Sequence, residues 1–185
     1  MSNLKQAIKQ NYVKCAKSPS YFINEFCTIQ HPQRGKIKFK LYPYQYDVLD
    51  EFEKHDYNVV LKSRQLGIST LSAAYALWMM LFHNDKNILC IATSKDTAKN
   101  LVTKVRIMYE GLPNWLKTAI VENNKLSLIF KNGSQIKAIA SNESAGRSEA
   151  LSLLILDEAA FIDKIDIIWT AAQQTLATGG RCIGI

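Results

Sequence analysis

The amino-acid sequence predicts an α/β fold in which a central, mostly parallel β-sheet is flanked by helices. Short runs of large apolar residues alternate along the chain with longer segments of helical periodicity. Strands that carry apolar residues on both faces are typical of a parallel sheet buried between helices. The pair Asn132-Gly133 lies between two further apolar runs and predicts an inserted β-hairpin.

The N-terminal part is expected to contain little sheet. Residues 1–24 have the pattern of a short amphipathic helix that breaks at KSPSYF. Residues 31–45 are expected to form a loop followed by an extended segment, because Pro32 and Gly35 disfavour regular structure there. Residues 44–54 form the next expected helix, since their apolar side chains recur at helical spacing.

The later elements follow from the same periodicities. They are buried strands at 58–61, 87–93 and 151–161, a buried helix at 69–82, helices at 96–109 and 165–176, the hairpin at 126–140, a polar loop at 141–149 and a last strand from 181. Because the sequence stops on this strand, we expect it to be a fragment of a longer protein.

Composition excludes several classes of protein. The 185 residues are 48% hydrophobic and 21% charged, which is typical of a globular domain with a core. The longest apolar run is too short to span a bilayer, so no membrane association is expected. The four cysteines have no C-x-x-C spacing, which argues against a metal site or a disulfide framework and fits a reducing cytosol.

The positive charge is concentrated at the N-terminus. Residues 1–40 contain eight Lys or Arg and one acid, Glu25, whereas residues 41–185 contain fifteen of each sign. We therefore divide the chain into a basic N-terminal arm, 1–40, and a domain, 41–185. The arm has two interpretations that the sequence leaves open: contact with a polyanion through counterion release, or a solvated and partly mobile segment.

The stretch VVLKSRQLGIST, residues 59–70, resembles a phosphate-binding loop whose lysine has moved. Such loops place backbone N–H groups and a helix N-terminus around phosphates. Gly67 permits close approach, and Ser69 supplies a hydroxyl for Mg²⁺. Ile68 stands where the usual lysine belongs. Lys62 at the start of the loop and Arg64 within it are the two candidate cations.

A second signal is the run LLILDEAAF, in which four apolar residues precede Asp157 and Glu158. An acid at the carboxyl end of a central parallel strand lies where α/β sheets bind ligands. Asp157 is expected to hold Mg²⁺, and Glu158 to act as general base toward the attacking water. Two favourable acids at a helix N-terminus are the plainer alternative. The order of the loop and the acids favours nucleotide hydrolysis.

Two outlying features fit the same chemistry. Tyr44 and Gln45 precede the first strand, and a glutamine amide can both donate to and accept from an adenine edge while a tyrosine ring stacks on it. Arg147 lies on the polar loop before the acid-bearing strand, from where it could reach a neighbouring subunit's γ-phosphate as an arginine finger. Each of these residues is also compatible with an ordinary surface role.

The segments YPYQ, KSRQLGIST, NGSQIKAIAS, GRS and LLILDEAAFI, in this order, resemble the ATPase domain of the large terminase subunit of tailed bacteriophages. That subunit is the motor that packages DNA into the procapsid. The resemblance runs from about Tyr21 to the end of the sequence. It implies a P-loop NTPase fold of the additional-strand, conserved-glutamate type, with 41–185 as the ATPase domain and the C-terminal nuclease domain absent.

The resemblance also implies cofactors, partners and location. It implies ATP and Mg²⁺, double-stranded DNA, the portal protein and the small terminase subunit. It further implies a homo-oligomeric ring, commonly a pentamer, in the host cytoplasm, docked on the procapsid portal during packaging. DNA cleavage is not expected without the nuclease domain.

The resemblance assigns roles to individual residues. Residues 62–70 match the Walker A motif, in the variant whose lysine stands at the start of the loop, and Asp157 and Glu158 match Walker B and the catalytic glutamate. The catalytic set implied is Glu158, Lys62, Arg64 and Arg147; the ATP-binding set is Tyr44, Gln45, Lys62, Ser63, Arg64, Gln65, Leu66, Gly67, Ile68, Ser69 and Thr70; the metal ligands are Ser69 and Asp157.

Two alternatives stay open at this point. A helicase-like DNA-dependent ATPase would need further motifs and a second domain of the same kind. A non-hydrolysing DNA-binding or assembly module with a degenerate loop is favoured by Ile68 and the basic arm, whereas the paired acids at 157–158 argue against it.

Overall fold

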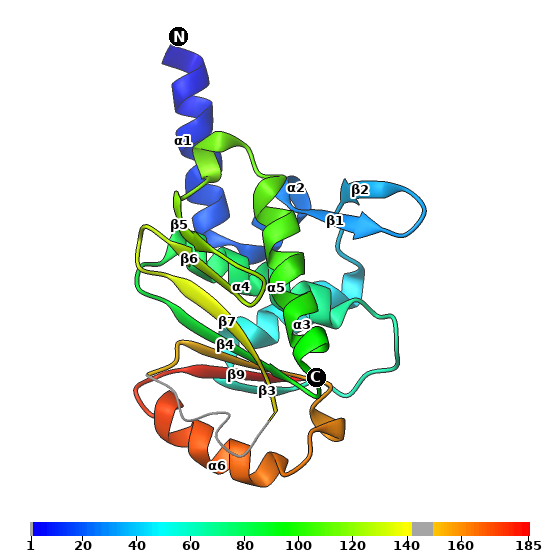
Figure 1. Ribbon diagram of the computed structural model, residues 1–185. Coiled ribbons are helices and arrows are strands. Elements are labelled where there is room, and N and C mark those ends of the chain that lie inside the picture. Colours follow the sequence, from blue (N-terminus) through cyan, green and yellow to red (C-terminus); the bar gives the residue numbers. More distant parts are fainter. Residues whose placement is uncertain (1, 142–149) are drawn as a thin grey trace.

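The computed structural model describes residues 2–141 and 150–185 and shows a central sheet between two helical layers (Figure 1). The seven strands run in the order β3-β9-β8-β4-β7-β6-β5. Their bounds are β3 Tyr57–Val59, β4 Asn87–Ala92, β5 Ile120–Asn123, β6 Ser127–Phe130, β7 Gln135–Ala140, β8 Leu153–Asp157 and β9 Arg181–Gly184. Strands β3, β9, β8, β4 and β7 are mutually parallel, and β6 and β5 continue the sheet antiparallel.

The helices are α1 Ser2–Lys17, α2 Pro19–Phe26, α3 Pro43–Lys54, α4 Ile68–Phe82, α5 Lys95–Glu110 and α6 Ile165–Leu176. Two short 3₁₀ helices, η1 Asn114–Leu116 and η2 Ala159–Phe161, and a separate hairpin, β1 Thr28–His31 and β2 Gly35–Lys38, complete the described fold. None of the helices that the structure describes is both long and apolar enough to cross a bilayer.

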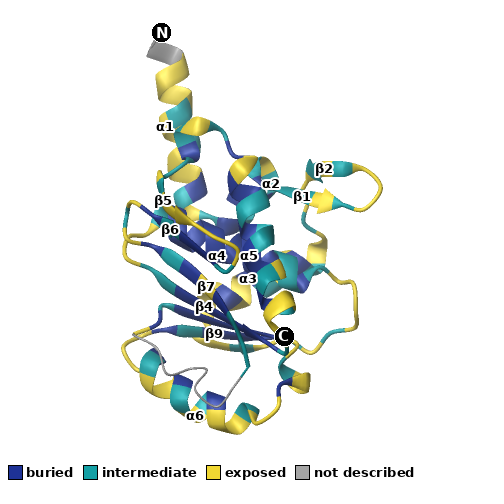
Figure 2. Ribbon diagram, viewed as in Figure 1, coloured by how far each residue is buried: buried dark blue, intermediate teal, exposed yellow. Residues whose placement is uncertain are grey.

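The pleat of the central strands divides the core into two clusters. On β4, Ile88 and Cys90 belong to the cluster formed with α1 to α5, whereas Leu89 and Ile91 belong to the cluster formed with α6. This alternation explains why the run is apolar throughout, as expected for a parallel strand covered on both faces. The dark central strands in Figure 2 show the same burial.

Several predicted elements are confirmed. The helix expected at 69–82 is α4, and the last helix appears as α6. The acid-bearing strand expected at 151–161 is the shorter β8, because the backbone turns at the left-handed Glu158 into η2. The inserted hairpin is β6–β7, which pair antiparallel. Since β7 is parallel to β4 on its other side, the hairpin extends the sheet directly.

Three expectations differ from the structure. The strand expected at 58–61 is not buried: among the described residues, β3 is an edge strand that pairs with β9, and Val59 and Leu61 are 91% and 100% exposed. The loop expected at 31–45 contains strand β2 of the β1–β2 hairpin. The single N-terminal helix is two helices, because the Ser18 side chain caps α2, accepting from the Tyr21 N–H at 3.1 Å, with Pro19 in the first turn.

Much of the basic segment 1–40 packs against the rest of the chain. Cys15, Phe22 and Ile23 are fully buried in the larger core cluster, and the Trp78 indole N–H donates to the Cys15 carbonyl at 2.8 Å. The first turns of α1 and the β1–β2 hairpin project from the body of the molecule (Figure 1). The functional division of the chain at residue 40 stays a prediction.

Candidate functional site

The segment 60–67 links the carboxyl end of β3 to the first turn of α4. Gly67 caps α4 in the left-handed region with φ of 71°, and Gln65 is also left-handed with φ of 66°. A Cβ at Gly67 would lie 3.0 Å from Nε2 of Gln45, so both the backbone conformation and the space favour glycine. The first N–H groups of α4 have no partner within the helix, which makes this turn suited to an anion.

The second component of the site is an acid from the centre of the sheet. Asp157 ends β8 and is 6% exposed, and its Oδ1 accepts a hydrogen bond of 2.8 Å from the Ser69 hydroxyl in the first turn of α4. The two residues are 88 positions apart. Helix α4 follows β3, which lies two strands from β8 in the sheet. The fold therefore brings the loop and the acid into direct contact.

These two oxygens suit a hard cation. Mg²⁺ prefers oxygen ligands and is commonly held by one or two carboxylates together with waters and the substrate's phosphates. The Ser69 hydroxyl and the Asp157 carboxylate provide such a pair beside the loop. No group of three or more His, Cys, Asp or Glu suited to a metal occurs among the described residues.

Glu158 lies beside Asp157 but in a different environment. Its side chain is exposed, and its backbone is left-handed with φ of 57°, a conformation that costs an L-residue about 1 kcal/mol. Its Oε2 accepts a hydrogen bond of 3.2 Å from the Thr93 hydroxyl, and the next N–H, of Ala159, donates to the Ile185 carbonyl at 2.8 Å. The sequence analysis assigned no role to Thr93. The signal that could have identified it is a polar residue at the end of a buried strand.

The candidate cations have unequal surroundings. Lys62 is half-buried and Arg64 is exposed, and neither forms an ion pair with another residue in the described part of the chain. Both ammonium and guanidinium groups are thus available to a ligand. Ile68 is 2% exposed and belongs to the larger core cluster, so its position contributes packing to α4.

The remaining predicted loop residues lie on the same turn. Ser63 and Gln65 are exposed, Leu66 is 36% exposed, and Thr70 is half-buried in α4. These residues belong to the loop or to the first turn of α4, and their roles in nucleotide binding stay predictions. Arg147 lies outside the described residues.

Tyr44 and Gln45 contact the loop from α3. The Tyr44 hydroxyl donates to the Leu66 carbonyl at 2.8 Å, and Nε2 of Gln45 donates to the same carbonyl at 3.1 Å. The amide oxygen of Gln45 accepts from the Tyr42 N–H at 3.1 Å, and the whole residue is 1% exposed. Gln45 therefore ties α3 to the loop here, and its role in reading adenine stays a prediction.

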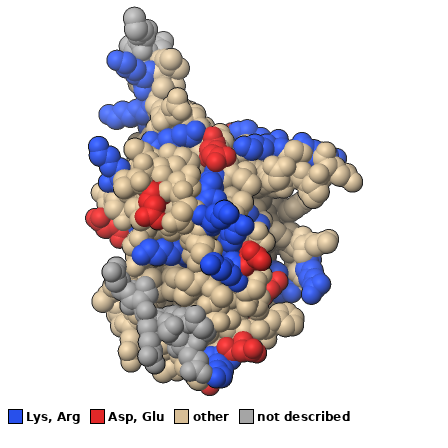
Figure 3. Space-filling view, viewed as in Figure 1, with Lys and Arg blue, Asp and Glu red and all other residues tan. Residues whose placement is uncertain are grey.

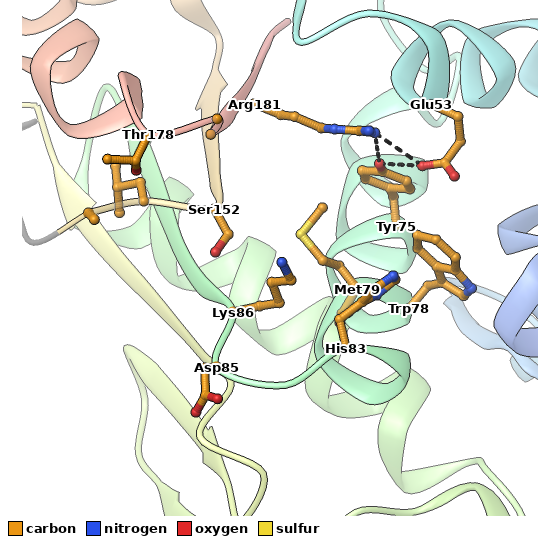
Figure 4. Close-up of a pocket in the computed structure, with 14 residues that line it drawn as sticks. Glu53, Tyr75, Trp78, Met79, His83, Asp85, Lys86, Ser152, Thr178 and Arg181 are labelled. Carbon is orange, nitrogen blue, oxygen red and sulfur yellow. Dashed lines mark hydrogen bonds and ion pairs between the residues drawn. The ribbon is translucent and has the colours of Figure 1, made fainter.

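A separate cavity of about 420 Å³ lies where strands β4, β8 and β9 begin, at the end of these strands opposite the loop (Figure 4). At its rim, one guanidinium nitrogen of Arg181 donates to the Tyr75 hydroxyl at 2.9 Å and lies 3.3 Å from the Glu53 carboxylate. Burial, reinforced by the hydrogen bond to Glu53, raises the pKa of Tyr75. This network joins α3, α4 and β9 away from the loop.

Comparisons with known proteins show the family and the fold of the chain. The family model for the terminase large subunit, T4-like-virus type, N-terminal part, matches residues 59–182. The crystal structure of the HK97 bacteriophage large terminase is similar with a TM-score of 0.69 and 23% identity, over 91% of this chain and 36% of that chain. This chain thus spans about a third of the length of that terminase.

Two further structures have the same fold. The large terminase ATPase domain of Thermus phage P74-26 matches with a TM-score of 0.59 and 21% identity, over 80% of this chain and 64% of that one. A large terminase from a thermophilic bacteriophage, in complex with ATP-gamma-S, matches with a TM-score of 0.58 and 16% identity, over 79% and 37% of the two chains. The α/β P-loop fold expected from the sequence is confirmed.

Proposed function

Because the chain belongs to the family of T4-like-type terminase large subunits, as its N-terminal part, we propose that it is the ATPase domain of a viral DNA-packaging motor. It hydrolyses ATP with Mg²⁺ to move double-stranded DNA into a procapsid. The observation that carries this proposal is the 2.8 Å hydrogen bond between Ser69 on the loop helix and Asp157 on the central strand. This contact between the loop helix and the acid-bearing strand supports an ATP–Mg²⁺ site formed by the two.

Each residue has a role in this proposal. The N–H groups at the start of α4 and the cations Lys62 and Arg64 hold the phosphates. Ser69 and Asp157 hold Mg²⁺, which when bound neutralises charge on the β- and γ-phosphates. Glu158 orients the attacking water and accepts its proton. Nucleotide-bound relatives of the same fold support ATP as the ligand.

The assembled motor supplies the remaining parts. We assign Arg147 as the arginine finger that acts on a neighbouring subunit's γ-phosphate in a homo-oligomeric ring, commonly a pentamer. Such a finger contributes roughly 10³–10⁵ in rate elsewhere, so an isolated subunit should be slow. The ring is proposed to dock on the portal protein in the host cytoplasm and to receive DNA from the small terminase subunit.

The structure weakens the non-hydrolysing alternative. That interpretation depended partly on Ile68, taken as a lost lysine. Ile68 is packed in the core, so the isoleucine has a structural reason of its own while Lys62 and Arg64 stay available. A helicase-like ATPase would use the same site chemistry, and it would need further motifs and a second domain of the same kind.

The proposal predicts that the wild-type chain binds MgATP and hydrolyses it slowly. Calorimetry with MgATP measures binding, and release of phosphate from ATP measures turnover. Ser69→Ala should weaken binding of MgATP more than binding of ATP in excess EDTA, because the hydroxyl serves the metal. Equal effects on both would contradict a metal site at Ser69. A matched control is Ser20→Ala, because this half-buried serine of α2 lies outside the predicted ATP-binding set.

The basic face of α1 is expected to contribute to DNA binding. Lys5 and Lys9 are exposed one turn apart on α1, a helix that contains no acid, and Figure 3 shows basic side chains along it. Replacing both by Gln should lower DNA affinity and reduce the slope of log K against log salt by about 0.9 per lost phosphate contact. The measurement is a salt titration of DNA binding by fluorescence anisotropy.

The control for this prediction is the pair Lys54→Gln and Lys117→Gln, which removes the same charge elsewhere. An identical slope in the test and control proteins would overturn a specific contribution of α1. Deletion of residues 1–40 is unsuitable for this test, because it would remove Phe22, Ile23 and Cys27 from the core.

A further inference from the structure

The cavity of about 420 Å³ at the start of the central strands has the size of a small-molecule site, for which about 300–1,000 Å³ is typical. Its lining includes Lys86 directly before β4, Ser152 directly before β8 and Arg181 at the start of β9. Figure 4 shows these three side chains around one space, together with Met79 of α4. We call this space the Lys86 cavity.

The acid at the rim of the Lys86 cavity is already compensated. One carboxylate oxygen of Glu53 accepts from the Tyr75 hydroxyl at 2.6 Å, and the Arg181 guanidinium lies 3.3 Å from the same oxygen. Arg181 also donates to the Phe52 carbonyl at 2.7 Å. Glu53 and Arg181 therefore form an ion pair in which each charge has its partner.

The backbone acceptors at two helix ends beside the cavity also have donors. The carbonyl of His83, the residue after α4, accepts from the Ser134 hydroxyl at 2.9 Å. The Leu176 carbonyl at the end of α6 accepts from the Gly180 N–H at 2.9 Å. Figure 4 shows the Asp85 carboxylate directed away from the other lining side chains. The acceptors around the cavity are thus poorly placed to hold a cation.

Lys86 and Ser152, by contrast, have donors to offer. The Lys86 ammonium is half-buried and has no hydrogen bond or ion pair within the described part of the chain. The Ser152 hydroxyl accepts from the Asn87 N–H at 3.2 Å, which leaves its own O–H to donate. Figure 4 shows the Lys86 ammonium directed into the cavity. A half-buried cation attracts an anion more strongly than a fully solvated one, because water screens it less.

From this arrangement we propose that the Lys86 cavity binds a small organic anion, whose phosphate or carboxylate group is held by Lys86 and Ser152. The organic part of the ligand packs on Met79, which lines the cavity and is 6% exposed. A thioether makes favourable contacts with aromatic rings, so an aromatic anion is a suitable probe. The site lies at the end of the parallel strands opposite the loop and is separate from the proposed ATP site.

The test follows the Met79 methyl group by NMR during titration with phenyl phosphate and, separately, with benzoate. The sequence contains four methionines, so the methyl spectrum is simple, and Met79→Leu assigns the signal. The Met79 signal should shift saturably, while that of Met108, a core residue of α5 outside the cavity lining, should stay in place. Comparison of the two compounds shows which anionic group the site takes.

Lys86→Gln should weaken binding of the compound by about tenfold or more, the value of a charge-assisted hydrogen bond. Lys86→Arg keeps the charge and should retain most of the affinity. Because the ammonium has no partner within the described residues, neither change should disturb the fold. Lys125→Gln is the matched control, since Lys125 is an exposed lysine in the turn between β5 and β6.

Lys62→Ala separates the Lys86 cavity from the loop, which is itself suited to a phosphate. The Met79 shift should persist in this variant, and its loss there would overturn the proposal by assigning the anion to the loop. The absence of a saturable shift with both compounds would also overturn it, as would equal affinities of the wild type and Lys86→Gln. None of these measurements uses ATP hydrolysis, so the inference can fail while the proposed function stands.

Discussion

Replacing Glu158 by Gln is expected to abolish ATP hydrolysis while MgATP binding persists. Glutamine has nearly the same size, and it can still accept the hydrogen bond from Thr93. It cannot take a proton from water, so the loss should be about 10²–10⁴ in kcat. Phosphate release measures the loss, and calorimetry shows whether the nucleotide site is intact.

The environment of Glu158 makes this substitution a clean test. The side chain is exposed, so the change buries no unpaired group and should leave the stability of the fold nearly unaltered. Glu51→Gln is the matched control, because Glu51 is an exposed glutamate on α3 that pairs with Lys54. Hydrolysis that survives Glu158→Gln would assign the base to another residue, and loss of ATP binding would show that Glu158 shapes the site itself.

The sequence predicted the elements whose periodicity is strongest. Helix α4 is apolar on every side and is buried on nearly every side, and β8 carries an unbroken apolar run between two helical layers. The Asn132-Gly133 hairpin formed as expected because Gly133 takes the left-handed conformation that the turn requires, with φ of 80°. In these elements local preference and tertiary packing favour the same structure.

The elements that were missed are short or depend on neighbours. The stretch GKIKFK alternates apolar and basic residues, which is a strand signal, yet its strand is only four residues long. The apolar run at β3 looked like a buried strand, and only the strand order reveals that it lies at an edge. Burial of a strand depends on what lies beside it, and a single segment of sequence does not contain that information.

The same distinction applies to the site. The meeting of loop and acid could be predicted, because the carboxyl ends of parallel strands share one edge of the sheet. The contact between Thr93 and Glu158 could not, since it depends on the register of β4 against β8. Nor could the packing of Gln45 under the loop, where its amide is used by the Tyr42 N–H and the Leu66 carbonyl.

The strongest test of the relocated lysine is a pair of substitutions, one of which should lower MgATP affinity and the other the stability of the fold. Lys62→Ala should weaken MgATP binding by about tenfold to a hundredfold, the value of a charge-assisted hydrogen bond, and leave the free energy of unfolding nearly unchanged. Ile68→Ala should lower the free energy of unfolding by about 2–5 kcal/mol, because a core side chain that is 2% exposed is truncated. Its folded fraction should bind MgATP almost as the wild type does.

Denaturant titration and calorimetry on the two variants separate charge from packing. If Lys62 supplies the cation, MgATP affinity falls in Lys62→Ala while its stability is nearly unchanged. In Ile68→Ala the stability falls while the affinity of the folded protein is nearly unchanged. Equal affinities in the two variants would rule out the relocated lysine. Undiminished binding in Lys62→Ala combined with a large loss in Arg64→Ala would move the role to the loop arginine. In either case Ile68 belongs to the core, and we expect the positive charge near the phosphates to come from the loop that precedes Gly67.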